Sequence, residues 1–307
     1  MYMLPAPDTR HHRTLTWTRE SAGDRNGSAM IKTVLLGLDG SEHSGVAERY
    51  ALWLAERLDA LVVGLHVVDI VSIEGSFLHD VSGSLGFEPY LDFSTKMREA
   101  LHQRGKVLLE EFETRAREAG VRSDAVLAMG IVGNEIAERG RTSDLVVIGH
   151  RGVNERFTTG LLGGTTESVT RKCTTPVLVT PPAFREPASV LLAFDGSERA
   201  AAAMHAAAEW CVSLGLPLTV LSIADDEEQA ERTIAAARGY FDGYDLEVQF
   251  EVRTGPAPEG IVDTIETGAF DLLFIGAYGQ ARLLEMVLGS TTEFVLRNAP
   301  CPVILTR

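Results

Sequence analysis

The sequence predicts an α/β protein made of two tandem, doubly wound domains, each with a parallel sheet of five strands. Unbroken apolar runs, such as residues 61–68 and 145–148, alternate with amphipathic stretches such as residues 107–119. Such runs suit parallel strands covered on both faces, and the amphipathic stretches have helical spacing. The same succession of segments occurs twice. This alternation predicts parallel sheets with right-handed crossovers.

An internal repeat supports the division into two halves. Residues 34–42 (VLLGLDGSE) match residues 190–198 (VLLAFDGSE) at an offset of 156 residues. The offset falls to 125 at Gly130 and Gly255, so half one carries about 31 extra residues between its second and third strands. A repeat of this kind predicts two similar structural units.

The first strand of each half ends in the same turn, Asp39-Gly40-Ser41 in half one and Asp195-Gly196-Ser197 in half two. Two interpretations of the aspartates are open. An Asp side chain readily accepts a hydrogen bond from nearby backbone, which makes it a turn residue. Alternatively, Asp39 and Asp195 bind a nucleotide or position a metal ion, because this edge of a doubly wound sheet holds ligands.

The extra residues of half one predict a long loop over residues 69–95. Loops of this length usually have a function or are disordered. This one contains many apolar side chains, which is unusual for a free coil. It is expected to cover a site in half one or to contact a neighbouring subunit, and the sequence does not choose between these.

A glycine-rich turn follows the fourth strand of each half and precedes a predicted helix. In half two the pattern is Gly276, Gly279, nine residues, then Gly289-Ser290. In half one Gly149 and Gly152 are followed, after ten residues, by Gly163-Gly164. Backbone N–H groups and the helix dipole at such a turn favour an anion, so the pattern predicts phosphate binding.

These turns also have a purely structural interpretation. Glycine supplies positive φ in tight turns. The segment 290–293 (STTE) fits a capping box, in which Ser290 starts a helix without any ligand. Three arginines in the loops either counter phosphate charge or are solvated, namely Arg151, Arg156 and Arg282. A structural role is expected for His66 and His150.

Length, charge and cysteine content limit the classes of protein to which this chain can belong. The 307 residues suffice for two domains of ordinary size, and the net charge of −15 argues against a nucleic-acid partner. No apolar run has the length of a membrane span. The three cysteines have no metal-ligand spacing, which favours reduced thiols and a cytoplasmic location.

The expected domains are residues 30–182 and 187–307, joined by a proline-rich linker. Residues 1–29 are polar, contain four arginines and lack the apolar core of a secretory signal. They are expected to be a disordered tail, or else a non-native extension with Met30 as the true start.

The combined motifs resemble those of the universal stress proteins, and the two copies resemble the tandem members of that family. The shared motifs are Asp-Gly-Ser after strand one, the G-x2-G-x9-G-[ST] loop, and a closing strand that begins at Pro176 and Pro302. The resemblance covers residues 31–307. It implies an adenine-nucleotide alpha hydrolase-like fold, ATP binding in the subgroup with this loop, and pairing of the two domains through their last strands.

The resemblance also assigns site residues: an acidic residue, an adenine-side residue at the end of strand two, and the phosphate and ribose loop. In half one these are Asp39, Val67, Gly149, Gly152, Gly163, Gly164 and Thr165. In half two they are Asp195, Ile223, Gly276, Gly279, Gly289, Ser290 and Thr291. From the residues alone, Val67 and Ile223 are more typical of core. Half one has one extra loop residue and Gly164 in place of Ser or Thr, so weaker binding is expected there.

The sequence therefore predicts a cytosolic tandem universal stress protein that binds ATP and acts as a nucleotide-responsive stress regulator with a protein partner, as a single chain or a homodimer. No catalytic residues are assigned, because the loops lack the lysine of a Walker A motif and no Ser-His-Asp or Cys-His set stands at an evident site. Slow hydrolysis assisted by Mg²⁺ is one alternative. A nucleotide-free interaction module and an adenylate-transferring enzyme are the others.

Overall fold

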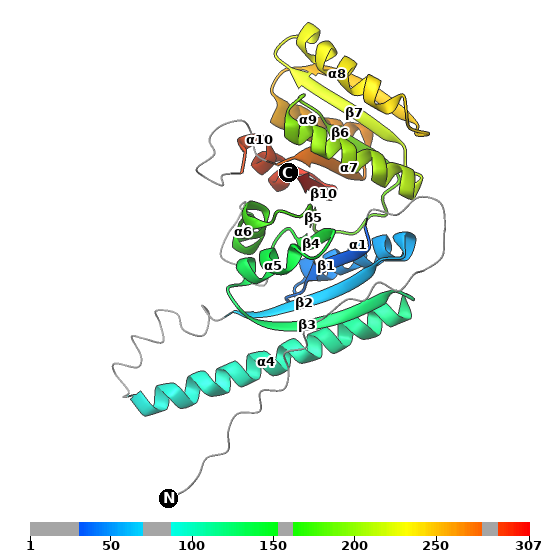
Figure 1. Ribbon diagram of the computed structural model, residues 1–307. Coiled ribbons are helices and arrows are strands. Elements are labelled where there is room, and N and C mark those ends of the chain that lie inside the picture. Colours follow the sequence, from blue (N-terminus) through cyan, green and yellow to red (C-terminus); the bar gives the residue numbers. More distant parts are fainter. Residues whose placement is uncertain (1–30, 70–86, 153–161, 278–287) are drawn as a thin grey trace, which may run out of the picture.

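The computed structural model describes residues 31–69, 87–152, 162–277 and 288–307, and these form a single ten-stranded sheet with helices on both faces (Figure 1). The strands are β1 (Thr33–Gly37), β2 (Leu61–Asp69), β3 (Arg122–Gly130), β4 (Leu145–Gly149), β5 (Val177–Thr180), β6 (Val190–Ala193), β7 (Leu218–Ala224), β8 (Val248–Thr254), β9 (Leu272–Gly276) and β10 (Val303–Thr306). The helices are α1 (Glu42–Leu58), α4 (Phe87–Glu118), α5 (Val132–Gly140), α6 (Gly164–Lys172), α7 (Glu198–Leu214), α8 (Glu227–Phe241), α9 (Ala257–Gly268) and α10 (Ser290–Asn298). The predicted alternation of strands and helices is confirmed in both halves.

The strand order is β3-β2-β1-β4-β5-β10-β9-β6-β7-β8, so the second half repeats the first in reverse. Neighbouring strands within each half are parallel, as in β1–β2 and β6–β7. The two halves meet where β5 and β10 pair antiparallel, with Leu178 opposite Ile304. The expected pairing of the halves through their last strands is therefore confirmed.

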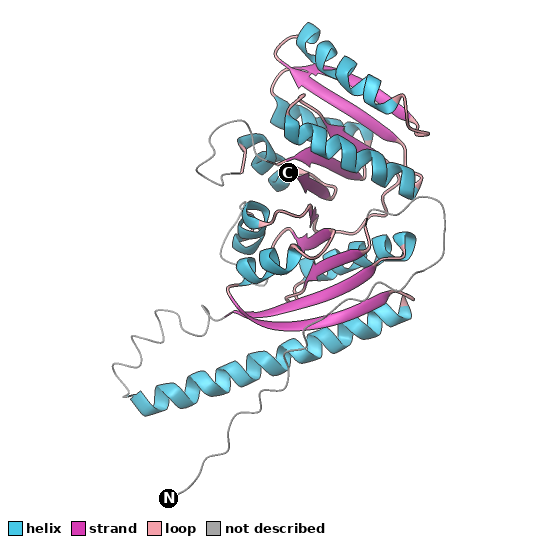
Figure 2. Cartoon of the chain, viewed as in Figure 1, coloured by secondary structure: helices cyan, strands magenta, loops and turns pink. Residues whose placement is uncertain are grey.

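The strands bury alternate side chains in two apolar layers, one on each face of the sheet. Helices cover both of these faces (Figure 2). Leu36 of β1 joins the layer under α1, α4, α7 and α8, whereas Leu35 joins the layer under α5, α6, α9 and α10. Both layers contain residues from both halves. The part of the chain that the structure describes has no helix long and apolar enough to cross a bilayer.

The helix α4 corrects the expectation of a loop over residues 69–95, because residues 87–95 are helical. It has 32 residues, whereas its counterpart α8 has 15. Its register is set by tertiary packing: the Phe112 ring is fully buried where Gly64 of β2 leaves room for it. Arg115 adds a two-bond ion pair with the buried Glu48 of α1, at 2.5 and 2.9 Å. The N-terminal end of α4 runs past the carboxyl ends of β2 and β3 (Figure 1).

The linker is packed against both halves. The Phe184 ring lies 4.6 Å from the Tyr50 ring of α1, and the Tyr50 hydroxyl accepts a hydrogen bond from Arg185 N at 3.0 Å. The Arg185 guanidinium reaches the other half, where its Nε lies 2.8 Å from Oδ1 of the buried Asp271. These contacts, more than the prolines alone, hold the linker in place.

Gly64→Ala is expected to lower the free energy of unfolding by about 1–3 kcal/mol, because overpacking a filled core is costly. A Cβ at Gly64 would lie 2.6 Å from two carbons of the Phe112 ring. The matched control is Gly45→Ala in α1, where no atom lies within 4 Å of the new Cβ. That change should raise stability by roughly 0.5–1 kcal/mol through helix propensity. Urea denaturation measures both, and equal effects would contradict this account.

The three cysteines are free and buried, and their thiols are expected to be unreactive in the folded chain. Burial raises the pKa of Cys211 to about 12 and that of Cys301 to about 12, and it also raises the pKa of Cys173. Because the thiolate is the nucleophile, little reactive form exists near neutral pH. An aromatic disulfide reagent at about pH 8 should label no cysteine of the folded protein and all three in denaturant. Rapid labelling of the folded chain would contradict the burial.

Candidate functional site

A cavity of about 560 Å³ opens at the carboxyl edge of the sheet in half one. Its lining comes from the ends of β1, β2 and β4, from α4 and α5, and from the start of α6. All seven predicted half-one site residues line it: Asp39, Val67, Gly149, Gly152, Gly163, Gly164 and Thr165. Residues far apart in the sequence thus meet at one place, as the doubly wound topology requires.

The Asp39-Gly40-Ser41 turn starts α1 and places Asp39 at the cavity. Asp39 Oδ1 accepts a hydrogen bond from Ser41 N at 2.8 Å, and Gly40 has φ +78°. Ser41 caps α1, because its hydroxyl accepts from Ser44 N at 3.1 Å. The turn interpretation of Asp39 is therefore correct for Oδ1, while Oδ2 lies on the side of Gly152.

Half two repeats this turn in detail. Asp195 Oδ1 accepts from Ser197 N at 2.9 Å, and Gly196 also has φ +78°. Ser197 caps α7 by accepting from Ala200 N at 3.1 Å. The repeated Asp-Gly-Ser thus has a structural reason in both halves.

Gly149 and Gly276 are required by close approach of the first helical turn. A Cβ at Gly149 would lie 2.9 Å from His43 Cβ in α1, and one at Gly276 would lie 2.7 Å from the backbone carbonyl carbon of Arg199 in α7. Neither glycine is among the described residues with positive φ. The alternative in which these loop glycines supply positive φ is therefore wrong for Gly149 and Gly276, and crowding is the reason for them.

The other half-one glycines differ in what surrounds them. A Cβ at Gly152 would meet Asp39 Oδ2 at 2.6 Å, and one at Gly163 would lie 3.2 Å from Arg151 Cα. At Gly164 no atom lies within 4 Å. Other atoms thus pack closely against the backbone of Gly152 and Gly163 at the edge of the cavity, whereas Gly164 faces open space.

The helices α6 and α10 begin without a side-chain cap. Gly163 is the N-cap of α6 and Gly289 that of α10, and in neither case does a side chain bond the first turn. The first intrahelical bonds come from Glu167 N and Glu293 N, which leave the three preceding N–H groups of each helix for another acceptor. A phosphate is a suitable acceptor there.

The predicted capping box at Ser290 is wrong. Ser290 is the first residue inside α10, and the capping position before it is glycine. A box needs a side-chain oxygen at the cap itself. The Ser290 hydroxyl is thus not used as the cap of its own helix.

Two threonines that the sequence analysis missed join the glycine turns to the helices. Thr166 Oγ1 donates to Gly149 O at 2.9 Å, and Thr292 Oγ1 lies 3.5 Å from Gly276 O. Thr166 also lines the cavity. The signal was available, since Thr166 and Thr292 stand 126 residues apart at matching positions of the repeat.

Charged and polar side chains complete the cavity. Arg104 of α4 and Asp69 of β2 line it, and the sequence analysis assigned neither of them to the site. Arg151 lines it as well. His66 has the expected structural partner, because its Nδ1 lies 2.7 Å from Leu38 O and donates to that carbonyl. The described residues contain no cluster of three or more His, Cys, Asp or Glu side chains placed to hold a metal ion.

The half-two site is described in part. Asp195, Gly276, Gly289 and the first turn of α10, with Ser290 and Thr291, stand at the corresponding edge of the sheet. Ile223 is the last residue but one of β7 and packs on α9, since a Cβ at Gly260 would lie 2.6 Å from Ile223 Cδ1. The predicted residues Gly279, Arg282 and, in half one, Arg156 lie outside the described residues.

Val67 and Ile223 differ in their surroundings. Val67 is 8% exposed and belongs to the apolar layer, yet it also lines the half-one cavity. Ile223 is half-buried and packs at the border of the same layer. Core packing, the more typical role for both, is thus seen in both, and Val67 in addition lines the cavity.

Comparison with known proteins agrees with this architecture. The sequence pattern of the universal stress protein family matches residues 30–181 and again 188–307. Universal stress protein Slr1230 of Synechocystis sp. is 30% identical over 287 residues, which cover 90% of this chain and 100% of the relative. A universal stress protein of Mycolicibacterium smegmatis is 26% identical over 306 residues, which cover 91% of this chain and 98% of the relative.

A solved structure shows the same fold. The crystal structure of a universal stress protein from Archaeoglobus fulgidus superposes with a TM-score of 0.70 at 21% identity, and the match covers 90% of this chain and 98% of that one. The match to each of these three proteins spans both halves of the chain. The chain belongs to the universal stress protein family, as a member with two tandem domains.

Proposed function

We propose that this chain binds ATP at its glycine turns and acts in the cytosol as a nucleotide-responsive stress regulator. One observation carries the proposal: seven residues chosen for nucleotide binding from sequence line a single cavity at the carboxyl edge of the sheet. Its volume of about 560 Å³ lies within the range of small-molecule sites, about 300–1,000 Å³.

The cavity has separate features for the two ends of a nucleotide. Val67 presents an apolar surface suited to a base, at the end of β2. The N-terminus of α6 presents uncapped N–H groups and the positive end of the helix dipole, suited to phosphate. Asp39 Oδ2 lies so close to Gly152 that a Cβ there would meet it at 2.6 Å, so the carboxylate and the glycine backbone stand side by side at the cavity.

We propose that half two binds ATP more tightly than half one. Ser290 offers a hydroxyl at the first position of α10, where half one has Gly164. A bound Mg²⁺ would supply additional charge neutralisation for the phosphates in either half. Regulation then follows from occupancy: phosphate held at the helix termini fixes the glycine turns, and this changes the surface shown to a protein partner.

Gly289→Val is expected to remove ATP binding from half two, because an isopropyl group at the helix N-terminus fills the space for phosphate. Isothermal titration calorimetry should show two ATP molecules bound per wild-type chain and one per variant chain. The matched control is Gly239→Val in α8, an exposed position where no atom lies within 4 Å of an added Cβ. Unchanged affinity and stoichiometry in Gly289→Val would contradict the half-two site.

Gly164→Ser is expected to strengthen ATP binding by half one about 2- to 10-fold, the effect of one added hydrogen bond. The substitution restores the hydroxyl that Ser290 provides in half two, at a position with open space around it. Gly164→Ala is the control, because it adds carbon without a donor and should leave the affinity unchanged. If serine and alanine have the same effect, the hydroxyl has no role in the weaker binding of half one.

A further inference from the structure

The strongest unassigned feature of the half-one cavity is Arg104, which reaches it from the helix α4. Resting on the proposed nucleotide binding, we propose that Arg104 binds the phosphate groups of the half-one ligand. In this role the guanidinium replaces the hydroxyl that Gly164 lacks. The half-one ligand is then a nucleoside polyphosphate. The affinity for an uncharged nucleoside should not depend on this arginine.

The position of Arg104 is fixed by the packing of its helix. The next residue, Gly105, lies so close to β2 and β3 that a Cβ there would meet His66 Cδ2 at 2.6 Å and Leu127 Cδ1 at 2.7 Å. Further along α4 come the Phe112 contact and the ion pair of Arg115 with Glu48. The backbone of Arg104 therefore has a fixed place beside the cavity, and only its side chain has to become ordered when it binds an anion.

The guanidinium of Arg104 stands over the turn that begins α1. Its Nη2 lies 3.9 Å from the position of a Cβ on Gly40, beside the side chain of Leu108. Leu101, one turn earlier on the same side of α4, also lines the cavity. Arg104 thus belongs to the face of α4 that looks onto the site.

The charges of the cavity favour a cation at this place when a phosphate binds. Asp39 and Asp69 both line it, and their carboxylates would repel a phosphate. Arg104 and Arg151 offset these two charges, and a guanidinium can bind phosphate through two hydrogen bonds. Without Arg104, a triphosphate would enter a cavity with an excess of negative charge.

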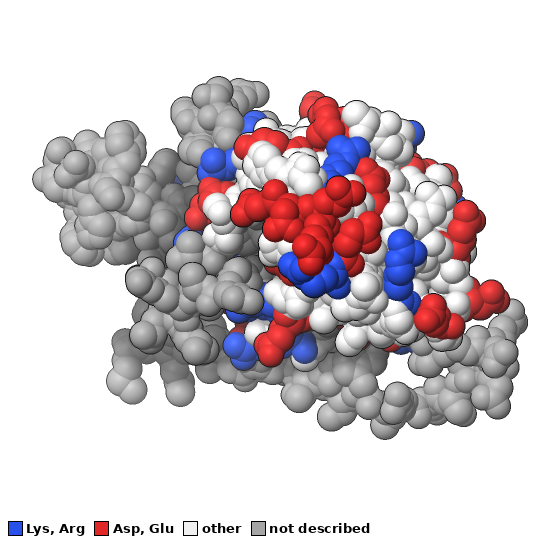
Figure 3. Space-filling view, turned by 90° about the horizontal axis from the view of Figure 1, so that it is seen from above, with Lys and Arg blue, Asp and Glu red and all other residues white. Residues whose placement is uncertain are grey.

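The surrounding sequence of α4 is basic in a chain that is otherwise acidic. The chain has a net charge of −15, and Asp and Glu gather on the face over half two that Figure 3 shows. In contrast, residues 96–106 of α4 include four cations and the single carboxylate of Glu99. The four cations are Lys96, Arg98, Arg104 and Lys106. This stretch attracts anions to the end of α4 that overhangs the cavity.

Among the residues that the structure describes, half two has no cation within 4 Å of the matching place. Over Gly196, the counterpart of Gly40, the nearest atom is the methyl carbon Cγ2 of Thr233 in α8, at 3.5 Å. The two halves therefore differ at both places: half two has Ser290 at its helix N-terminus and a threonine methyl group over Gly196, whereas half one has Gly164 and the arginine of α4. The arginine thus narrows the difference in ATP affinity that the missing hydroxyl causes.

The test is Arg104→Gln in the full-length chain that also carries Gly289→Val, so that the half-one site is measured alone. Calorimetric titration with ATP should show a loss of affinity of about 10- to 100-fold, typical of a hydrogen bond to a charged group. Titration with adenosine should change by less than about twofold, because adenosine carries no phosphate. Arg104→Lys should retain most of the ATP affinity, since it retains the charge.

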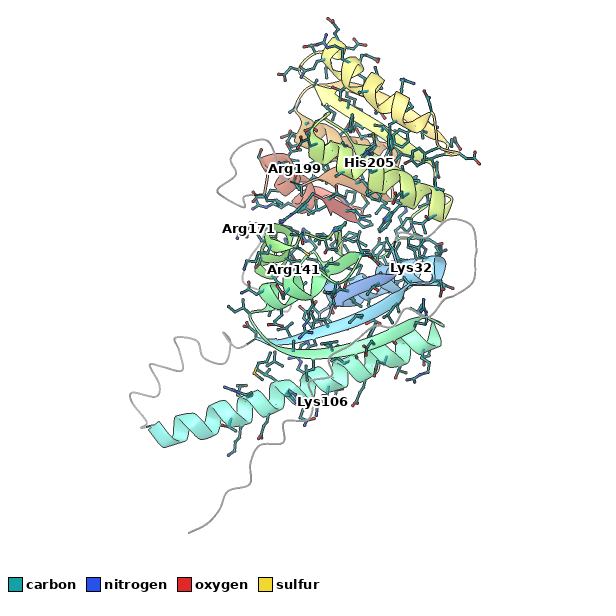
Figure 4. All side chains as sticks on the ribbon, viewed as in Figure 1. Lys32, Lys106, Arg141, Arg171, Arg199 and His205 are labelled. Atoms are coloured by element: carbon teal, nitrogen blue, oxygen red, sulfur yellow. The ribbon has the colours of Figure 1, made fainter. Side chains whose placement is uncertain are left out.

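Lys106→Gln is the matched control. Lys106 is exposed on the side of α4 turned away from the sheet (Figure 4) and does not line the cavity. The Lys106→Gln variant should bind ATP with unchanged affinity. This comparison separates a specific contact of Arg104 from the general positive charge of α4. Circular dichroism checks that each variant is folded. If Gly289→Val proves unfolded, the same titrations on the chain without it are fitted to two sites, of which Arg104→Gln should weaken one.

The outcomes separate this inference from the function on which it rests. ATP binding that is unaffected by Arg104→Gln, or equal losses for ATP and adenosine, would overturn the role of Arg104 and leave the proposed function intact. A wild-type chain that binds no ATP would overturn both. If Lys106→Gln lowers the ATP affinity as much as Arg104→Gln does, long-range attraction by α4 explains both losses. That result would also overturn the proposed contact between Arg104 and phosphate.

Discussion

The antiparallel pairing of β5 with β10 is the constraint on which the rest of the structure depends. Each half alone would leave its last strand as an edge with unpaired backbone groups. Backbone hydrogen bonds between the two edges join two five-stranded sheets into one, and the apolar layers on both faces become continuous. Because β4 and β9 flank this pair, the glycine turns that follow them are carried on strands next to the centre of the sheet.

The same junction links the helices of the sites to the opposite half. Arg307, the last residue of half two, donates from Nη2 to the carbonyl oxygens of Thr170 and Arg171 at the end of α6. A cation at a helix C-terminus is favourable for the helix dipole. The helix α6 thus faces the cavity with its N-terminus and half two with its C-terminus. The linker adds a second connection, through Tyr50 on one side and Asp271 on the other.

The sequence predicted the parts of the fold that depend on local pattern. Apolar runs, helical spacing and the repeat sufficed for the order of elements, and the repeated motifs sufficed for the half-one cavity. The errors concern features set by tertiary contact. The helix α4 begins inside the predicted loop, and what holds it is Phe112 against a glycine of β2 and Arg115 against Glu48, which no local pattern reveals.

Errors within the site have the same origin. The crowding that requires Gly149 and Gly276 comes from helices more than 70 residues away in the sequence, whereas positive φ is a local property. The sequence around Ser290 fits a capping box, but the helix begins one position earlier than that pattern requires. Gly289 is therefore the N-cap, and Ser290 is the first helical residue. Arg104 belongs to no motif, and only the packing of α4 brings it to the cavity.

The central position of β10 also bears on how the protein matures. This strand ends one residue before the end of the chain, yet it pairs with both β9 and β5 in the middle of the sheet. Half one has all five of its strands as soon as β5 emerges from the ribosome, and domains generally fold as units during synthesis. Half two and the union of the halves must wait until β10 has been synthesised, so the newly made chain carries a folded first half with an open edge while the second half is being made.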